Sequence, residues 1–159
     1  MNIEIERKFL IDVNRLPESF KAAGAFEIVQ TYISFSPGTR IRKINNSNYY
    51  FTKKVPIDAQ GLAHEETEYM ITPEEYQEFL KKQVGNTVHK TRYELCENKA
   101  KIEVDIYSHG LTGLAVAEVE FRSVKEAEAF VPPAWFGLEV TSDSRYKNMN
   151  LARYGMPKP

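Results

Sequence analysis

Charged residues of like sign recur two positions apart in six segments of this chain. The pairs are Glu4 and Glu6, Arg40 and Arg42, Glu66 and Glu68, Lys90 and Arg92, Glu103 and Asp105, and Glu118 and Glu120. Successive side chains of a β-strand point to opposite faces, so both members of a pair project from one face. The residue between them is Ile or Val in four of the pairs, and it projects from the other face.

Two kinds of ligand would suit these side chains. Arginine offers a planar fork and lysine a compact charge, and both bind phosphate. The cations are Lys8, Arg40, Arg42, Lys54, Lys90 and Arg92. The carboxylates suit a hard divalent cation, which takes oxygen ligands. Six positive and eight negative groups sum to −2 when all are ionised, so we expect polyphosphate to bind well only when metal is present.

Short connections and alternating apolar residues indicate a chain made mainly of β-strands. Strands are predicted over 2–11, 26–35, 39–44, 48–55, 63–71, 87–97, 100–108 and 114–122. Helices are predicted over 73–84, which Thr72 and Glu75 would cap, over 124–130 after Ser123, and over 144–153. A weaker helix is predicted over 17–23. Eight strands in one domain favour a closed antiparallel β-barrel with a few flanking helices, because closure removes exposed edges.

Two arrangements of such a barrel would explain the charged pairs. A single strand with this pattern usually turns its charges to solvent and its apolar side to a core. Repeated over so many strands, that arrangement places like charges side by side on the surface, where they repel. We therefore expect the charges to line the barrel interior, with Ile5, Ile41, Val104 and Val119 packing outward against the helices.

The composition limits the class of protein. The chain has 159 residues, enough for one domain, and 42% of them are hydrophobic, which excludes disorder. A net charge of −1 argues against a simple nucleic-acid binder. No apolar run approaches the roughly 20 residues that span a bilayer, and the charged start is unlike a signal peptide. The single Cys96 fits a reducing cytoplasm.

Several other residues are expected to be structural. His64, His89 and His109 fit no zinc spacing and are expected at the surface, and Cys96 is expected to pack in a strand. Trp135 is expected to anchor the core. Arg145 and Lys147 on the last helix are expected to be solvated, with a phosphate contact as the alternative. No glycine-rich phosphate loop of the GxxxxGK[ST] or GxGxxG type occurs.

Taken in order, these segments resemble the CYTH superfamily, the triphosphate tunnel metalloenzymes. The resemblance begins with the ExExK signature at Glu4, Glu6 and Lys8 and runs on through QTY, TRIR, FTKK, ETEY, KTRY, IEVD and AEVE to the segment 139–148. It covers essentially the whole chain, 1–159, as a single tunnel domain. It implies an eight-stranded tunnel that holds a linear triphosphate beside Mg²⁺ or Mn²⁺.

The resemblance also implies roles for the charged residues. Metal would be held by Glu4, Glu6, Glu118 and Glu120, and phosphate by Lys8, Arg40, Arg42, Lys54, Lys90 and Arg92. The family's Leu-Thr-x-Lys pattern places Lys54, not Lys53, in the tunnel. Water would be oriented by a carboxylate among Glu66, Glu68, Glu103 and Asp105, with Lys8 as an alternative proton carrier. Tyr32 is a further catalytic candidate, because related thiamine triphosphatases pair a tyrosine with a lysine.

The activity implied is metal-dependent hydrolysis of tripolyphosphate to pyrophosphate and phosphate, because the compact length and the QxY, TRIR and KTRY elements resemble the small bacterial tripolyphosphatases. Three alternatives stay open: a thiamine or nucleoside triphosphatase, a class IV adenylate cyclase, and a sensor that binds polyphosphate or nucleotide without cleaving it. The expected partner is a small phosphorylated substrate, with no nucleic acid and no membrane. The sequence also leaves a homodimer open.

Overall fold

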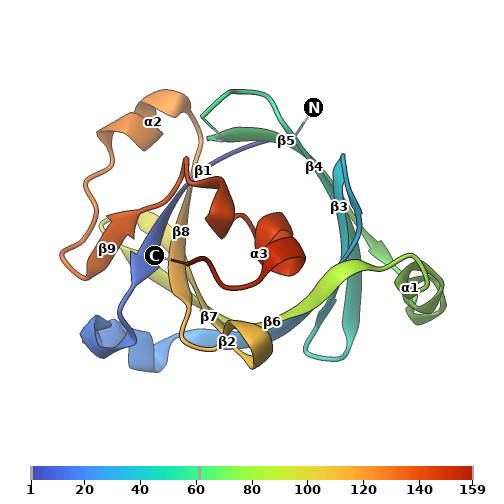
Figure 1. Ribbon diagram of the computed structural model, residues 1–159. Helices are drawn as coiled ribbons and strands as arrows, with labels where there is room; N and C mark the ends of the chain where they lie inside the picture. The colour runs from blue at the N-terminus through green and yellow to red at the C-terminus, as the bar shows by residue number, and fades with distance from the viewer. Residues whose placement is uncertain (1, 61, 159) are drawn as a thin grey trace.

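A barrel of antiparallel strands forms the body of the computed structural model, which describes residues 2–60 and 62–158. The barrel strands are β1 (Ile3–Ile11), β2 (Gly24–Phe35), β3 (Gly38–Ile44), β4 (Asn48–Pro56), β5 (Ala63–Ile71), β6 (Val84–Glu97), β7 (Ala100–Tyr107) and β8 (Ala115–Phe121). A short strand β9 (Phe136–Glu139) pairs with the C-terminal end of β1. Viewed down its axis, the barrel is a ring of strands (Figure 1).

A short pairing between β1 and β5, here called the seam, closes the ring. The strands follow the order β5-β4-β3-β2-β6-β7-β8-β1, and β1 then pairs with β5. That last pairing joins Ile3, Glu4 and Ile5 to Glu65, His64 and Ala63, only three residue pairs, whereas β4 and β5 share eight. The seam is therefore the shortest pairing of the ring.

The largest hydrophobic core lies outside the ring. Phe9, Ile102, Val104 and Val119 are at most 2% exposed, and they pack beneath Phe136 of β9. The covering segments also include the 3₁₀ helix η2 (Glu18–Ala22), which contributes Phe20. The expectation that the apolar side of these strands faces outward is confirmed.

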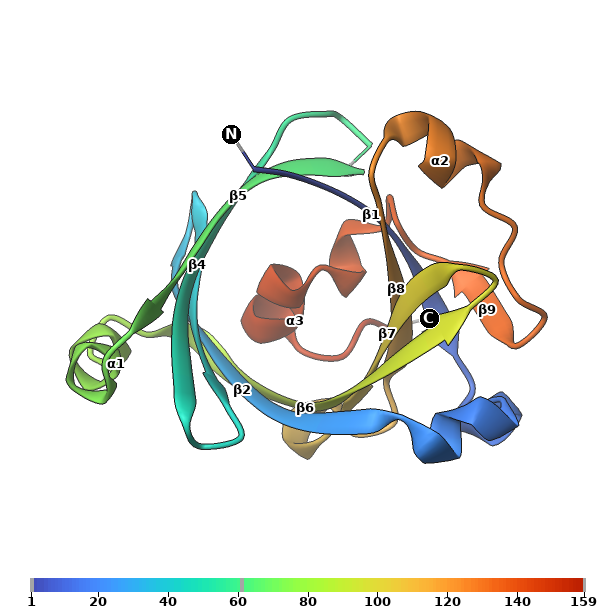
Figure 2. The ribbon, with the colours of Figure 1, turned by 180° about the vertical axis from the view of Figure 1, so that it is seen from behind.

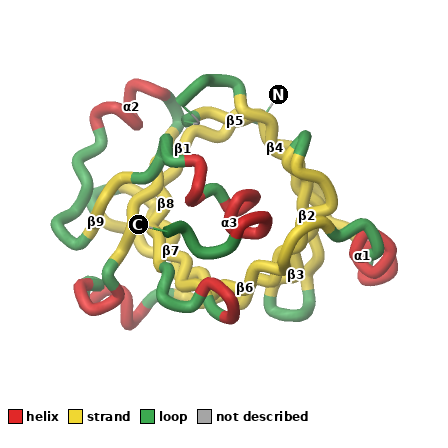
Figure 3. The backbone as a smooth tube through the Cα atoms, in the orientation of Figure 1, coloured by secondary structure: helices red, strands yellow, loops and turns green. Residues whose placement is uncertain are grey.

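Two α-helices cover the outside at other points. The tube in Figure 3 shows α1 (Pro73–Leu80) and α2 (Val124–Ala129) beyond the ring of strands. Tyr76 of α1 packs on Ile41, and Ala127 of α2 packs on Ile5. Thr72 and Glu75 form the expected capping box, in which each side chain accepts a hydrogen bond from the other residue's backbone N–H.

The third helix, α3 (Asn148–Tyr154), covers one end of the barrel. It lies within the outline of the ring from both sides (Figures 1 and 2). Its Leu151 and Ala152 pack on Tyr32, Val88 and other residues at that end of the interior. Gly85, with φ of +70°, permits the close approach, because a Cβ there would lie 2.8 Å from the Ala152 carbonyl oxygen. Among the described helices, none is long and apolar enough to cross a bilayer.

The eight barrel strands are confirmed to within three residues at each end, and four details of the predicted elements were wrong. The predicted helix 73–84 ends at Leu80. The Gln83 side chain donates to the Gly85 carbonyl oxygen, and β6 begins at Val84. The predicted helix 144–153 is a 3₁₀ turn, η4 (Ser144–Tyr146), followed by α3. The weak helix 17–23 is the 3₁₀ helix η2. Strand β9 was missed because Gly137 resembles a loop signal. Here the glycine permits close approach to β1, since a Cβ at this position would lie 2.7 Å from the Leu10 carbonyl oxygen.

Candidate active site

The strand registers place the predicted charged residues opposite one another on the inner face of the barrel. Lys8 lies opposite Glu118, and Lys54 lies opposite Glu66. Directly opposed residues share a face of the sheet, so these side chains meet inside the ring. Buried cations and anions thus occupy the space that a filled barrel gives to apolar side chains.

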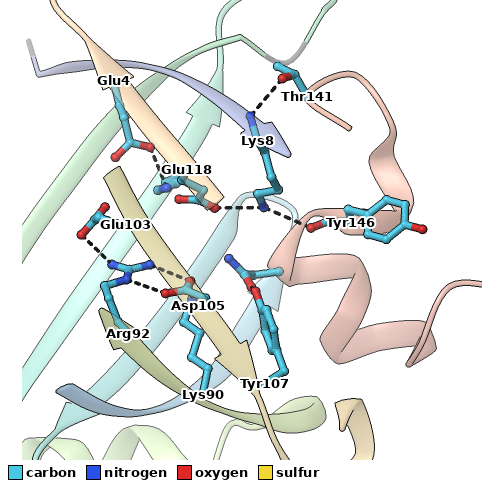
Figure 4. Close-up of polar contacts among 12 residues, drawn as sticks. Glu4, Lys8, Lys90, Arg92, Glu103, Asp105, Tyr107, Glu118, Thr141 and Tyr146 are labelled. Atoms are coloured by element: carbon cyan, nitrogen blue, oxygen red, sulfur yellow. Dashed lines mark hydrogen bonds and ion pairs between the residues drawn. The ribbon is translucent and has the colours of Figure 1, made fainter. Parts of the chain in front are cut away.

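Asp105 is the most deeply buried carboxylate among the described residues of this interior. Its side chain is 1% exposed, and its two oxygens accept hydrogen bonds from Nε and a terminal nitrogen of Arg92 at 2.7 and 2.9 Å (Figure 4). The Lys90 Nζ lies 2.8 Å away. Burial alone would raise the pKa of Asp105, but Arg92 and Lys90 hold it well below its usual range. Asp105 therefore orders two cations and stays ionised.

Lys90 has an unusual environment for a lysine. Its side chain is fully buried, and burial lowers its pKa to about 7, although Asp105 acts in the opposite direction. Asp105 shares its charge with Arg92, so Lys90 receives only part of a counter-charge. An amine with this pKa is partly neutral near pH 7 and can exchange a proton.

Lys8 joins the barrel interior to the C-terminal segment. Its Nζ lies 3.1 Å from Glu118 and donates a hydrogen bond of 3.1 Å to the carbonyl oxygen of Tyr146 (Figure 4). Its backbone N–H donates to Thr141. Burial would raise the pKa of Glu118, but Lys8 and other nearby cations lower it to about 2. The C-terminal segment thus supports the third residue of the ExExK signature.

Lys54 faces the tunnel as expected, while Lys53 is exposed. Its Nζ lies 2.7 Å from Glu4 and 3.7 Å from Glu66. On the same side of the ring, Glu68 accepts from Arg42 at 2.7 Å and from the Thr52 hydroxyl at 2.7 Å.

Several buried polar atoms in this interior lack a partner. Among the described residues, no hydrogen bond reaches Nε of Arg40 or of Arg42, or either side-chain amide atom of Gln30. Gln30 is fully buried and lies opposite Arg42. Buried groups of this kind are costly unless something bonds them. Free donors on buried cations suit an anionic ligand.

A group of potential metal-ligand atoms lies at the barrel seam. Glu4, Glu6 and His64 each bring one potential ligand atom, and these atoms lie within 4.8 Å of one another. Burial raises the pKa of Glu6, and the nearby Glu118 adds to the effect. A divalent cation would supply the missing positive charge, and carboxylate oxygens are suitable ligands for it. The residues present therefore fit a metal.

A cavity of about 570 Å³ connects these groups to one mouth of the barrel. Its inner wall includes Glu6, Lys8, Arg40 and Lys54, and its outer wall includes Lys147. Of Arg145 and Lys147, which were expected to be solvated, Lys147 lines the cavity, while Arg145 is exposed and pairs with Asp143 at 2.7 Å.

Other predicted site residues lie at the margins. Tyr32 is buried opposite Arg40, where it also packs on α3. Glu120 is exposed at the rim, opposite Glu6. Glu103 lies 3.3 Å from Arg92, and burial raises its pKa. Of the four carboxylates predicted to hold the metal, Glu4 and Glu6 lie close together at the seam.

Two of the residues set aside as structural were misjudged. His64 is 8% exposed and lies inside the barrel, whereas it was expected at the surface. It occupies the position two before Glu66 and so shares that residue's inner face, a signal the charge pattern contained. Cys96 lies near the end of β6 and is exposed, whereas it was expected to pack. Trp135 is buried as expected, and its indole N–H donates to Glu97.

Gln30 and the carbonyl oxygen of Tyr146 were also not anticipated as site groups. Gln30 is two residues from Ile28 and from Tyr32 on β2, so all three side chains point to the inner face. The strand period thus predicts its direction, but a pattern of charged residues does not single out an uncharged amide. The Tyr146 carbonyl is a backbone group, and its position depends on how the C-terminal segment returns over the barrel mouth.

Comparison with known proteins adds an independent line of evidence. A family model of the CYTH domain matches residues 2–132. An inorganic triphosphatase of Nitrosomonas europaea is 35% identical over 94% of this chain and 96% of its own length. One of Acetivibrio thermocellus is 32% identical over 96% and 95%. A solved structure of an inorganic triphosphatase has a TM-score of 0.68 and 34% identity, and the match covers 96% of this chain and 95% of that one.

Proposed function

The chain belongs to the CYTH domain family, and from this premise we propose that it is a metal-dependent tripolyphosphatase that releases phosphate from a linear triphosphate inside the barrel. The observation that carries the proposal is the set of buried cations with free donors, led by Arg40 and Arg42. A chain of phosphates offers the many anionic oxygens that these donors require. The two relatives named inorganic triphosphatase support the choice of an inorganic substrate.

In this proposal the cations grip the phosphates. Arg40 and Arg42 present forked donors from β3, and Lys54 of the neighbouring strand β4 lines the same cavity as Arg40. Arg92 and Lys90 approach from β6, held in place by Asp105. Positively charged groups that are already ordered stabilise charge as it develops on the transferring phosphoryl group and the leaving pyrophosphate.

We propose Mg²⁺ or Mn²⁺ as the metal, with Glu4 and Glu6 as its first ligands and Glu118 and Glu120 as further carboxylates near them. Bound there, the ion would neutralise phosphate oxygens and lower the pKa of a bound water. Glu6 suits this role best, because among the described residues no ion pair or hydrogen bond engages its carboxylate.

For water orientation, Glu66, Glu68 and Glu103 remain the stronger carboxylate candidates of the predicted set. Asp105 is committed to Lys90 and Arg92, so we assign it the ordering of cations. Lys90 is the stronger lysine candidate for proton transfer, because its pKa is lowered to about 7 while the unperturbed value is about 10. Lys8 holds Glu118 and the C-terminal segment, and Tyr32 would position Arg40.

The test is a substrate panel. Purified protein with Mg²⁺ or Mn²⁺ is given tripolyphosphate, pyrophosphate, ATP and thiamine triphosphate, and phosphate and cyclic AMP are both measured. We expect phosphate from tripolyphosphate first. Cyclic AMP without phosphate release would assign the cyclase alternative, and binding without any product would leave a sensor.

Glu4→Gln is the matched variant. We expect it to keep the fold, since the amide retains the shape, and to lose metal-dependent hydrolysis. Glu78→Gln, on α1 outside the barrel, is the control and should keep full activity, because the Glu78 side chain is 73% exposed and pairs with Lys81. A Glu4→Gln variant as active as the native chain would show that the first strand does not hold the metal.

The proposal also includes the extent of the domain, its location in the cell and its partners. We propose one tunnel domain over residues 1–159 that acts in the cytoplasm on a small phosphorylated substrate, without a nucleic-acid or membrane partner. Size-exclusion chromatography with light scattering tests whether a homodimer forms.

A further inference from the structure

We propose that His64 is a metal ligand alongside Glu4 and Glu6, and that its ring nitrogen makes this site favour Mn²⁺ over Mg²⁺. The inference rests on the proposed function for the presence of a metal in the barrel. It goes beyond that function in naming a nitrogen ligand and the ion that such a ligand selects.

The position of His64 follows from the seam of the barrel. His64 lies directly opposite Glu4 in the three-pair register between β5 and β1. Directly opposite residues share a face, and their Cβ atoms lie about 4.5–5.5 Å apart. Glu6 follows two residues after Glu4 on the same face. One potential ligand atom from each of the three side chains lies within 4.8 Å of the other two.

The imidazole of His64 lacks a bonding partner that would explain its burial. The residue is 92% buried, since 8% of its surface remains exposed, and it lines the cavity that leads to the barrel mouth. Within residues 2–60 and 62–158, no hydrogen bond reaches its buried Nδ1. An unbonded polar atom in such a place is costly, and metal-bound histidines use both ring nitrogens, one for the ion and the other for a hydrogen bond.

The charges around His64 attract a cation. Glu4, Glu6, Glu66 and Asp58 bring four negative charges. Lys54, 2.7 Å from Glu4 and 3.7 Å from Glu66, and Lys147 bring two positive charges. The local sum is −2 when these groups are ionised. A further lysine or a proton would offset only half of it, whereas one divalent ion offsets all of it.

The donor set distinguishes Mn²⁺ from Mg²⁺. Two carboxylates and an imidazole form a mixed oxygen and nitrogen site. Mg²⁺ demands near-octahedral oxygen ligands and keeps its waters, whereas imidazole suits first-row transition ions. Mn²⁺ accepts carboxylate, phosphate and water as well, so it suits both this donor set and a triphosphate.

Pulsed electron paramagnetic resonance of the Mn²⁺-loaded chain tests the ligand directly. We expect ¹⁴N modulation of the Mn²⁺ echo in the native chain and its replacement by ¹⁵N modulation when all histidines carry ¹⁵N. His64→Gln should abolish the modulation. His89→Gln is the matched control, because His89 stacks on His109 outside the tunnel, with ring centroids 3.7 Å apart, and this variant should retain it.

Calorimetry of the same proteins with each metal alone gives the selectivity. We expect His64→Gln to weaken Mn²⁺ binding about tenfold or more, in line with losses of 10–100-fold for disturbed metal sites, while Mg²⁺ affinity changes by less than about threefold. Urea unfolding of each variant checks the fold, and the ¹⁵N-labelled native chain needs no substitution at all.

Three results separate the possibilities. Mn²⁺ bound without nitrogen modulation would overturn the assignment of His64 and leave a carboxylate metal site intact. Nitrogen modulation that persists in His64→Gln and vanishes in His89→Gln would also overturn it and place the ion at the surface. Modulation as expected, in a protein that hydrolyses no triphosphate, would support the ligand while ending the proposed activity.

Discussion

Replacing Asp105 with asparagine removes the counter-charge of two buried cations while preserving the shape of the side chain. In the native barrel one oxygen of Asp105 accepts from Nε of Arg92 at 2.7 Å, and the other lies 2.9 Å from the same guanidinium and 2.8 Å from Lys90. Asparagine keeps one oxygen that can accept a hydrogen bond from Arg92, but its amide N–H₂ then lies next to Lys90. Lys90 then loses its anion inside a site from which water is excluded.

The magnitude follows from the burial of the pair. Removing one partner of a buried ion pair costs about 3–5 kcal/mol, because the remaining charge stays desolvated. We expect Asp105→Asn to lie near the lower figure, about 3 kcal/mol, since one acceptor remains. With a urea m-value of about 2 kcal/mol/M, this loss lowers the unfolding midpoint by about 1.5 M. For a chain of this size it lowers Tm by about 6–12 °C.

The assay is urea unfolding at equilibrium at pH 5, where Lys90, whose pKa is lowered to about 7, carries its proton in the native chain. Unfolding is followed by the fluorescence of Trp135, with two reference variants. Glu94→Gln breaks an exposed pair with Lys101 on the same two strands and should cost less than about 1 kcal/mol. Lys90→Met removes the cation that Asp105→Asn leaves without a counter-charge. In the Lys90→Met background, Asp105→Asn should therefore lower the unfolding free energy by at least about 1 kcal/mol less than in the native chain. A loss below about 1 kcal/mol for Asp105→Asn, or an equal loss in both backgrounds, would refute this reasoning.

Three further outcomes follow from other parts of the fold. The folded-state pKa of Lys90 is lowered to about 7, below an unfolded value of about 10, so the unfolded chain binds more protons between these values. The unfolding free energy of the native chain should therefore rise relative to Lys90→Met from pH 7 to 10, and urea titrations that show a fall would contradict it. Phe9→Ala, 2% exposed beneath β9, should cost about 3–5 kcal/mol in urea unfolding, and a loss below 1 kcal/mol would deny an outer core. Thr72→Ala removes the α1 cap and should cost about 1 kcal/mol, with Ser47→Ala in a turn as a near-neutral control.

Much of the barrel could be predicted because charge and hydrophobicity alternate with the same period. Ile41 and Val104 point outward for the reason that Arg40 and Asp105 point inward. The pairing of specific charges could not be predicted in this way, since it depends on strand registers such as Arg92 opposite Asp105. The sequence distance between Glu4 and His64 hides that they meet at the seam.

The C-terminal segment was less predictable for a different reason. Strand β9 and the break between η4 and α3 depend on contacts with β1 and with the barrel end, and not on local periodicity. Gly137 and Gly85 are the residues that permit those contacts, yet in the sequence each resembles an ordinary turn residue. The burial that lowers the pKa of Lys90 arises likewise from the assembled interior.

The coupling between metal and triphosphate inside the barrel is the central claim. Its most direct test is the calorimetric affinity for imidotriphosphate, which the protein cannot hydrolyse at the bridging positions, measured with Mn²⁺ and again with EDTA. Because the interior sums to −2 without metal, we expect Mn²⁺ to tighten binding by about tenfold or more, within the range usual for coupled sites. Equal affinity in Mn²⁺ and in EDTA would contradict the claim that carboxylates and cations serve one metal-bound triphosphate.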